Sequence, residues 1–427
     1  MKLGTTPPRH TNVAATALLI GLVMVSGNPA FSAPAVAPFF LALLAVGAAC
    51  VPFKRPTASF ATRCAILAAA FAGIFVAQRL TLGFVSWPAC ANFLAKLVLG
   101  GYIVHRMGSR FAPGLFHATY LLSAWSLFGY GLLLLTGPMA FPTLFSEAYL
   151  GENLRSLGFF TAASTDEWWR NSGPMWEPGA FQGVINLAIF LFPTSALMQR
   201  RNKLRLLVML VALLTTFSTT GYTVLFLVVL YKIARVGGFG LVKAPLFVLV
   251  LVVAVVAYTE VDFLGDKVAR QFENAKVLDD FSPDRFGALL FDLYYIEKSP
   301  WFGNGFHEST RYADHEHLQG VALGHGNGLS NFAATLGAAG MAAYLFGLAS
   351  SRFGRDRTDK IALATIVCVL AVGEQFLGYP LFLALPFVGG PALARRWLAA
   401  SHRGARPGGV NQMEQNHSAT LQQHAAR

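Results

Sequence analysis

Long apolar runs follow one another along most of the chain and are separated by short polar segments. A straight helical crossing of a lipid bilayer takes about 20 predominantly apolar residues. The pattern predicts an all-α, polytopic integral membrane protein with about twelve transmembrane helices, several of them shorter than a straight crossing needs. The runs lie near Asn12–Val25, Ala35–Val51, Cys64–Leu82, Pro88–Val104, Leu115–Leu135, Ala180–Leu197, Leu204–Phe217, Tyr222–Ile233, Ala244–Tyr258, Leu329–Ala349, Ile361–Leu377 and Leu381–Trp397.

Two polar intervals interrupt this series, at residues 137–179 and 259–328. They separate transmembrane helices one to five (residues 1–136) from helices six to nine (180–258) and helices ten to twelve (329–400). The remaining segment, residues 401–427, is polar and rich in Gln, His and Ala. Such a segment has too little apolar surface to fold alone, and we expect a disordered tail.

The formal net charge of +12 is distributed unevenly. Lys and Arg fall on alternate loops, at Lys2 and Arg9, Lys54 and Arg55, Arg106 and Arg110, Arg200–Arg205, Lys232–Lys243, Arg352–Lys360, and Arg395 and Arg396. The positive-inside rule then places both termini in the cytoplasm and both polar intervals outside. The first run has some features of a signal peptide, but an uncleaved helix preserves this alternation. We expect a bacterial inner-membrane protein with residues 259–328 as a large periplasmic loop, and no binding to nucleic acid.

The second polar interval contains a helix-start pattern. Ser282 is a suitable N-cap, Pro283 suits the first helical position, and an acid follows. An apolar stripe comes next, ending before Pro300, and consists of Phe286, Leu289, Leu290, Leu293 and Ile296. Arg285 lies in the first turn, where the helix dipole disfavours a cation unless an anion is bound there too. The alternative is an Arg285 side chain paired with Asp280 or Asp284.

Two Gly-rich motifs follow this helix. The turn Pro300-Trp301-Phe302-Gly303-Asn304-Gly305-Phe306 comes first, and Gly324-His325-Gly326-Asn327-Gly328 then leads into the tenth run with Gly337 and Gly340. An Arg-led helix, a Pro-aromatic-Gly-x-Gly turn and a His/Asn element before a Gly-x-x-Gly helix resemble the O-antigen ligase and polymerase superfamily of bacterial envelope glycosyltransferases. The resemblance covers residues from about Asp284 to Phe346.

A segment of the first polar interval is similar to an element of the polysaccharide polymerase members. It runs from Arg170 through Glu177-Pro178-Gly179 into the sixth run. A Glu at this membrane boundary can accept a proton or hold a sugar hydroxyl. Its alternative role is that of an acid at a helix N-terminus with Pro178 as the first helical residue.

The chain also departs from the ligase pattern. Ligases carry an Arg in a short turn after the seventh helix, whereas this turn contains Thr219 and Thr220, which can donate hydrogen bonds to phosphate but supply no charge. His325 and Asn327 are separated by a glycine, so either residue can carry the role of the family's histidine. Both departures favour a polymerase over a ligase.

The resemblance implies a donor glycan on undecaprenyl pyrophosphate, a sugar hydroxyl as acceptor, and a chain-length regulator and a flippase as partners. Arg285 would then hold the pyrophosphate and His325 would activate the acceptor, since neutral imidazole accepts a proton near pH 7. Glu177 would act beside them, and the substrate would also contact Arg170, Asn327, Thr219, Thr220 and Lys96. Lys96 is notable on its own, because a cation within an apolar run is costly unless it faces a wet cavity or a partner such as Glu374.

No cofactor is expected, and the cluster Asp314-His315-Glu316-His317 lacks the spacing of a helical metal site. Two other classes of protein stay open. A polysaccharide or lipid transporter would also have about twelve helices, although it usually shows repeated halves and broken helices near the midplane. A membrane scaffold without catalytic activity is the other.

Overall fold

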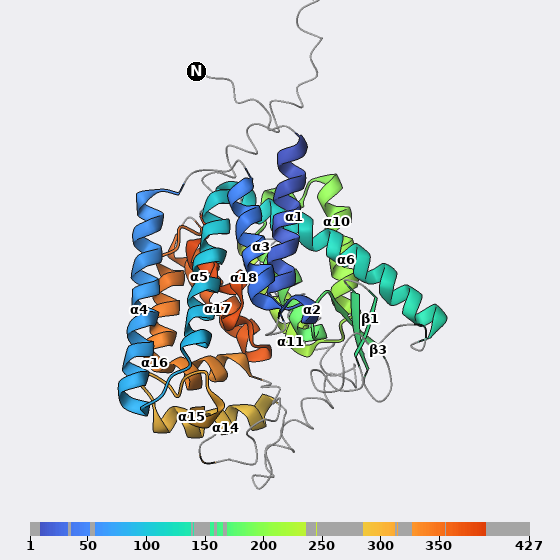
Figure 1. Cartoon of the computed structure of the whole chain (residues 1–427). Coiled ribbons are helices and arrows are strands. Elements are labelled where there is room, and N and C mark those ends of the chain that lie inside the picture. The colour runs from blue at the N-terminus through green and yellow to red at the C-terminus, as the bar shows by residue number, and fades with distance from the viewer. Residues whose placement is uncertain are drawn as a thin grey trace, which may run out of the picture. The chain divides into compact units, whose positions relative to one another are not determined.

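The computed structural model describes residues 9–32, 36–51, 56–137, 140, 154–157, 160–164, 169–235, 245, 285–311, 314, 327–354 and 356–389. The chain forms two units, Met1–Gly390 and Pro391–Arg427, and all described residues belong to the first. This part of the chain is mostly helical, as the apolar runs predicted (Figure 1).

The helices before the first polar interval are α1 (Arg9–Val25), α2 (Pro29–Ser32), α3 (Ala37–Cys50), α4 (Ala58–Leu82), α5 (Trp87–Met107), the 3₁₀ turn η1 (Gly108–Arg110) and α6 (Phe111–Thr136). Those between the two intervals are α8 (Pro178–Leu191), α9 (Thr194–Leu197), α10 (Arg200–Leu214) and α11 (Thr219–Arg235). The remaining helices are α14 (Arg285–Lys298), α15 (Glu308–Arg311), α16 (Gly328–Ala349), α17 (Arg357–Gly373), η4 (Phe376–Gly378), α18 (Pro380–Leu383) and η5 (Leu385–Phe387).

Three helical stretches among the described residues are long and apolar enough to cross a membrane: Ala58–Leu82, Trp87–Thr136 and Gly328–Ala349. The second is 50 residues long and includes both α5 and α6. Shorter apolar helices occupy Val13–Val25, Ala37–Cys50 and Pro178–Leu191. The chain is therefore a membrane protein by its helices, while the number of crossings and their direction stay predictions.

The last predicted span, Leu381–Trp397, is not one continuous helix over the residues that the structure describes. From Pro380 to Gly389 the chain forms α18, of four residues, and η5. Pro386 explains the interruption, because proline has no amide hydrogen for the ladder of a longer helix. The ninth predicted span, Ala244–Tyr258, lies almost wholly outside the described residues.

A small antiparallel sheet in the first polar interval corrects the prediction of an all-helical chain. Its strands are β1 (Leu154–Leu157), β2 (Phe160–Ser164) and β3 (Trp169–Gly173), in the order β1-β2-β3. Phe160 is fully buried and packs against Leu133 of α6. The segment is too short to give a clear alternating pattern, so the sheet depends on its packing against α6.

The amphipathic helix predicted in the second interval is present as α14, but its buried face is not the predicted apolar stripe. Leu290 and Leu293 are each 42% exposed, whereas Ala288, Asp292 and Tyr295 are buried. Spacings of four and three residues put these three on one face, and this face packs against α16. A buried aspartate thus lies at the centre of the contact between α14 and α16.

The aromatic Gly turn from Pro300 to Phe306 fills a break in α16. Gly337 has φ 68° and ψ −174°, which interrupts the helical hydrogen bonds. The turn replaces them: the Asn304 and Gly305 amides donate to the carbonyls of Ala334 and Thr335, at 2.8 and 3.0 Å. In return, the amides of Ala338 and Ala339 donate to the carbonyls of Pro300 and Trp301. The carbonyls of Ala334 and Thr335 and the amides of Ala338 and Ala339 therefore have partners, as a low-dielectric environment requires.

Helix ends from both halves of the chain meet on one side of this unit. Gln78, near the end of α4, donates to the Thr335 carbonyl near the start of α16, at 2.7 Å. The Glu374 side chain, just after α17, lies against Gly179 at the start of α8. Figure 1 shows α14 and α15 lying across the same ends of α4 and α16. The starts of α8 and α16 and the ends of α4 and α17 thus surround one region.

Candidate functional site

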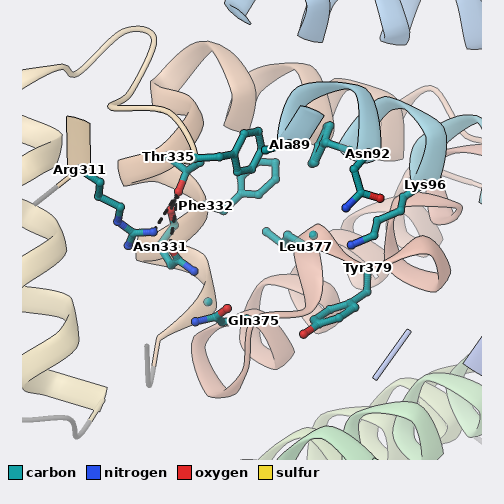
Figure 2. Close-up of a pocket in the computed structure, with 14 residues that line it drawn as sticks. Ala89, Asn92, Lys96, Arg311, Asn331, Phe332, Thr335, Gln375, Leu377 and Tyr379 are labelled. Atoms are coloured by element: carbon teal, nitrogen blue, oxygen red, sulfur yellow. Dashed lines mark hydrogen bonds between the residues drawn. The ribbon is translucent and has the colours of Figure 1, made fainter. Parts of the chain in front are cut away.

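A cavity of about 350 Å³ lies where Phe306 and Arg311 of the second polar interval meet α5 and the helix ends just described (Figure 2). It is lined by Ala89, Asn92, Phe93, Lys96, Phe306, Arg311, Gly328, Asn331, Phe332, Thr335, Gln375, Leu377, Gly378 and Tyr379. Two of these described residues are cationic and none is acidic. The volume is at the lower end of the roughly 300–1,000 Å³ usual for ligand pockets. The cavity can hold the head of a larger substrate, with the rest outside.

Lys96 supplies the first cation, from the middle of α5. Its Nζ lies 5.6 Å from the ring centroid of Tyr379, in a cation–π contact. Within the part of the chain that the structure describes, Lys96 has no ion pair and no hydrogen bond. A cation on an apolar helix is stable there only if it is hydrated or has an anionic partner. Lys96 therefore makes the cavity suited to an anion.

Arg311 supplies the second cation, from the last position of α15. Its Nη2 donates to Oδ1 of Asp292 at 2.8 Å, and its Nη1 donates to Oγ1 of Thr335 at 3.3 Å. The other carboxylate oxygen of Asp292 accepts a 2.6 Å hydrogen bond from the Ser330 hydroxyl. Asp292 is fully buried and Arg311 is 8% exposed. The carboxylate thus joins α14, α15 and α16 behind the cavity wall.

Burial raises the pKa of the Asp292 carboxyl, and Arg311 and the Ser330 hydroxyl act in the opposite direction. The desolvation cost of the carboxylate is thus only partly offset by its partners. The Arg311 guanidinium that contacts this carboxylate also lines the cavity.

Neutral polar and aromatic groups complete the wall. Figure 2 shows Lys96 and Arg311 entering from opposite sides, with Gln375 and Leu377 between them in this view. The amides of Asn92 and Asn331 and the phenol of Tyr379 are also at the wall. Amides can donate to phosphate oxygens or to sugar hydroxyls, and aromatic faces pack on apolar sugar faces. This combination can bind an anionic group joined to a sugar.

Arg170 and the turn containing Thr219 and Thr220 are brought together, but away from the cavity wall. The guanidinium of Arg170, on β3, donates to the carbonyls of Thr216 and Phe217, both at 3.0 Å. These carbonyls follow the end of α10, where a cation is favourable. Thr219 and Thr220 begin α11, and Thr220 packs against Gly373 at the end of α17. None of these three residues lines the cavity.

Glu177 and Asn327 are both at helix starts. Glu177 is the N-cap residue of α8 without a side-chain capping bond, and it is partly exposed. Asn327 is the N-cap of α16, and its Oδ1 accepts from the amides of Leu329 and Ser330 at 3.2 and 3.1 Å. Asn327 has therefore a capping role, which its sequence context did not indicate. Its oxygen already accepts hydrogen bonds from two backbone donors.

His325 lies outside the described residues. Arg285 is described as the first residue of α14, while its side chain is not. Their predicted roles stay predictions. Among the predicted site residues whose side chains the structure describes, Lys96 is the one that lines the cavity.

The sequence did not single out Arg311, Asp292 or Gln375. Arg311 stands in a polar stretch with ordinary composition, and Gln375 lies near the end of the apolar run Ile361–Leu377. Asp292 did carry a signal, since it is the one charged residue in the sequence between Phe286 and Ile296, with apolar neighbours at Phe291 and Leu293. A buried acid of this kind calls for a cationic partner.

Comparison with known proteins adds no relative: no family model matches the chain, and no curated protein matches it significantly. The class that the fold defines is that of helical membrane proteins with a polar cavity at one end of the helices.

Proposed function

We propose that the protein is a glycosyltransferase that polymerises undecaprenyl-pyrophosphate-linked repeat units into O-antigen, capsule or exopolysaccharide at the periplasmic face of the bacterial inner membrane. The alternative within this class is a ligase that transfers the lipid-linked glycan to lipid A-core or to protein. The sequence motifs that resemble this superfamily suggested the class.

One observation carries the proposal beyond those motifs. Lys96, on an apolar helix, faces a cavity that has no acidic lining residue among those described and that is closed by helices of the second polar interval. Such a cavity suits a substrate with an anionic group at the membrane boundary and a glycan outside. A lipid diphosphate that carries a sugar has this form.

The reaction needs few groups from the protein. The acceptor hydroxyl attacks the anomeric carbon, the bond from that carbon to the diphosphate oxygen breaks, and the lipid diphosphate leaves with the electron pair. Cations near the diphosphate stabilise the charge that accumulates on the leaving group. Lys96 is suited to this role, and Arg285 is proposed to share it. A base, for which His325 is proposed with Glu177 nearby, takes the acceptor proton.

A deletion strain tests the function. If the chain is a polymerase, the strain should contain lipid-linked single repeat units and no long glycan, and the wild-type gene should restore the polymer. His325→Ala and Arg285→Ala should each fail to restore it at normal expression, whereas Arg201→Gln, far along the chain in α10, should succeed. Analysis of lipid-linked and released glycans provides the measurement.

The same strain separates the alternatives. Long chains that accumulate on the carrier lipid would instead indicate a ligase. Unextended units trapped on the cytoplasmic side would indicate a transporter. Unchanged glycans, or full polymer from both alanine variants, would reject the glycosyltransferase proposal.

A further inference from the structure

The second cation of the cavity differs from the first in having a resident carboxylate. Lys96 has no ion-pair partner among the described residues, whereas Arg311 contacts both Asp292 and the cavity. The carboxylate lies behind the guanidinium and is fully buried, so water cannot screen it effectively. An anion that enters the cavity therefore meets a full positive charge at Lys96 and a partly compensated one at Arg311.

The position of the carboxylate is fixed from three helices. Asp292 belongs to α14, Arg311 to α15 and Ser330 to α16, and the two bonds to Asp292 measure 2.8 and 2.6 Å. The face of α14 that carries Asp292 packs on α16. Because Arg311 contacts Asp292 and also lines the cavity, an anion bound there shares Arg311 with Asp292.

We propose that Arg311 is a second anion-binding residue of the cavity and that Asp292 is its permanent counter-ion, which weakens the binding of a diphosphate. Asp292 acts through Arg311 and is a positioning residue. The inference rests on the proposed function for the identity of the ligand as a lipid diphosphate. In the proposed reaction, this weaker binding would favour release of the diphosphate leaving group. Without Asp292, the leaving group would stay bound to two cations that have no counter-ion.

The affinity for inorganic pyrophosphate distinguishes two roles of Asp292: a counter-ion that weakens anion binding, or an ion-pair partner that only supports the fold. Asp292→Asn keeps the shape of the side chain and an oxygen that can accept from Arg311, but it removes the negative charge. If Asp292 weakens anion binding, Asp292→Asn should bind inorganic pyrophosphate about fivefold or more tightly than wild type. The variant should nevertheless melt at a lower temperature than wild type. If Asp292 only supports the fold, the variant binds equally or less tightly.

The experiment uses the full chain, purified in detergent, and measures the affinity for inorganic pyrophosphate by calorimetry at fixed ionic strength. Asp314→Asn is the matched control, because it removes the same charge from the exposed pair Lys298–Asp314 on the same interval. It should change affinity by less than about twofold. Lys96→Gln should weaken binding about tenfold or more, since it removes a charged contact without removing any hydrogen bond between described residues.

Two further arms complete the test. The double variant Asp292→Asn/Arg311→Gln should lose the gain in affinity, because the gain acts through Arg311. Inorganic orthophosphate should bind more weakly than pyrophosphate to the wild type, as expected for a ligand that meets both cations. If orthophosphate binds as well as pyrophosphate, the cavity takes single phosphates such as phospholipid head groups, and the diphosphate inference is overturned.

The inference is also overturned if wild type binds no pyrophosphate, if Asp292→Asn binds it no more tightly, or if the gain persists in the double variant. These outcomes are independent of the proposed function, because they require no turnover. Unchanged glycans in the deletion strain would reject the glycosyltransferase proposal. Charge-dependent binding of pyrophosphate by the purified protein would still support the inference about Arg311 and Asp292.

Discussion

Asp292 connects three helices through one buried carboxylate. Its carboxylate is fully buried and bonded to Arg311 and Ser330, so three helices meet at one charge. Removal of one partner of a buried ion pair leaves the other partner desolvated without compensation, which is more costly than removal of both. The same pair is thus a structural contact and part of the cavity wall.

A double-mutant cycle measures this coupling. Asp292→Ala should lower the free energy of unfolding by about 3 kcal/mol, because it leaves the Arg311 guanidinium buried without its carboxylate. Arg311→Ala should also destabilise the protein, and the double variant should lose at least about 1 kcal/mol less than the sum of the two. Unfolding of the purified protein in detergent gives the three values. Strict additivity would show that the two side chains do not interact energetically.

At the scale of elements, the break in α16 and the aromatic Gly turn are one feature. The turn supplies the donors and acceptors that α16 lacks around Gly337, and Gly303 approaches the backbone of Thr335 too closely for a side chain. Thr335 and Phe306, on either side of this junction, both line the cavity. The junction therefore holds one wall of the cavity in place.

Gly337→Ala should disrupt this junction. The residue has a positive φ of 68°, and an added methyl group would overlap the carbonyl of Trp301. We expect a loss of about 2 kcal/mol or more in unfolding free energy, together with faster proteolysis near the turn. Gly73→Ala in α4 is the control, because an added methyl there meets nothing within 4 Å. It should be neutral or slightly stabilising, by up to about 1 kcal/mol. Equal melting temperatures for the two variants would contradict a structural role for the break.

At the scale of the whole molecule, four basic residues stand at helix ends that lie away from the cavity. The basic residues Arg106, Arg200, Arg235 and Arg357 belong to the end of α5, the start of α10, the end of α11 and the start of α17. The cavity lies near the opposite ends of α5 and α17. The charge pattern of the sequence predicts that this basic side faces the cytoplasm, and the orientation stays a prediction.

Thiol labelling tests this orientation. In a variant whose four cysteines are replaced, Lys298→Cys on α14 should react with a membrane-impermeant maleimide in intact spheroplasts. Arg201→Cys on α10 should react only after lysis, since it belongs to the opposite side. Both positions are exposed, so burial does not limit the reaction. Labelling of Arg201→Cys alone in intact cells would reverse the predicted orientation.

The sequence by itself determined the helical membrane character and the positions of most helices, and it marked Lys96 as a cation within an apolar run. Runs of apolar residues determine these features locally, because each helix satisfies its own backbone in lipid whatever surrounds it. It also indicated the helix at Arg285–Lys298 and the Gly turn after it, since proline and glycine act within a few residues. It did not identify which face of that helix is buried.

The tertiary structure alone decided the partners of the polar groups. Arg311 meets Asp292 and Ser330 only because α14, α15 and α16 pack together, and residues 19 and 38 positions apart give no periodic signal. The contact between Lys96 and Tyr379 and the packing of the sheet on α6 likewise join residues that are distant in the sequence. The spacing of residues along the chain indicates which helices and strands form. Whether a buried charge has a partner depends instead on the distance between residues on different helices, and this distance is set only in the folded protein.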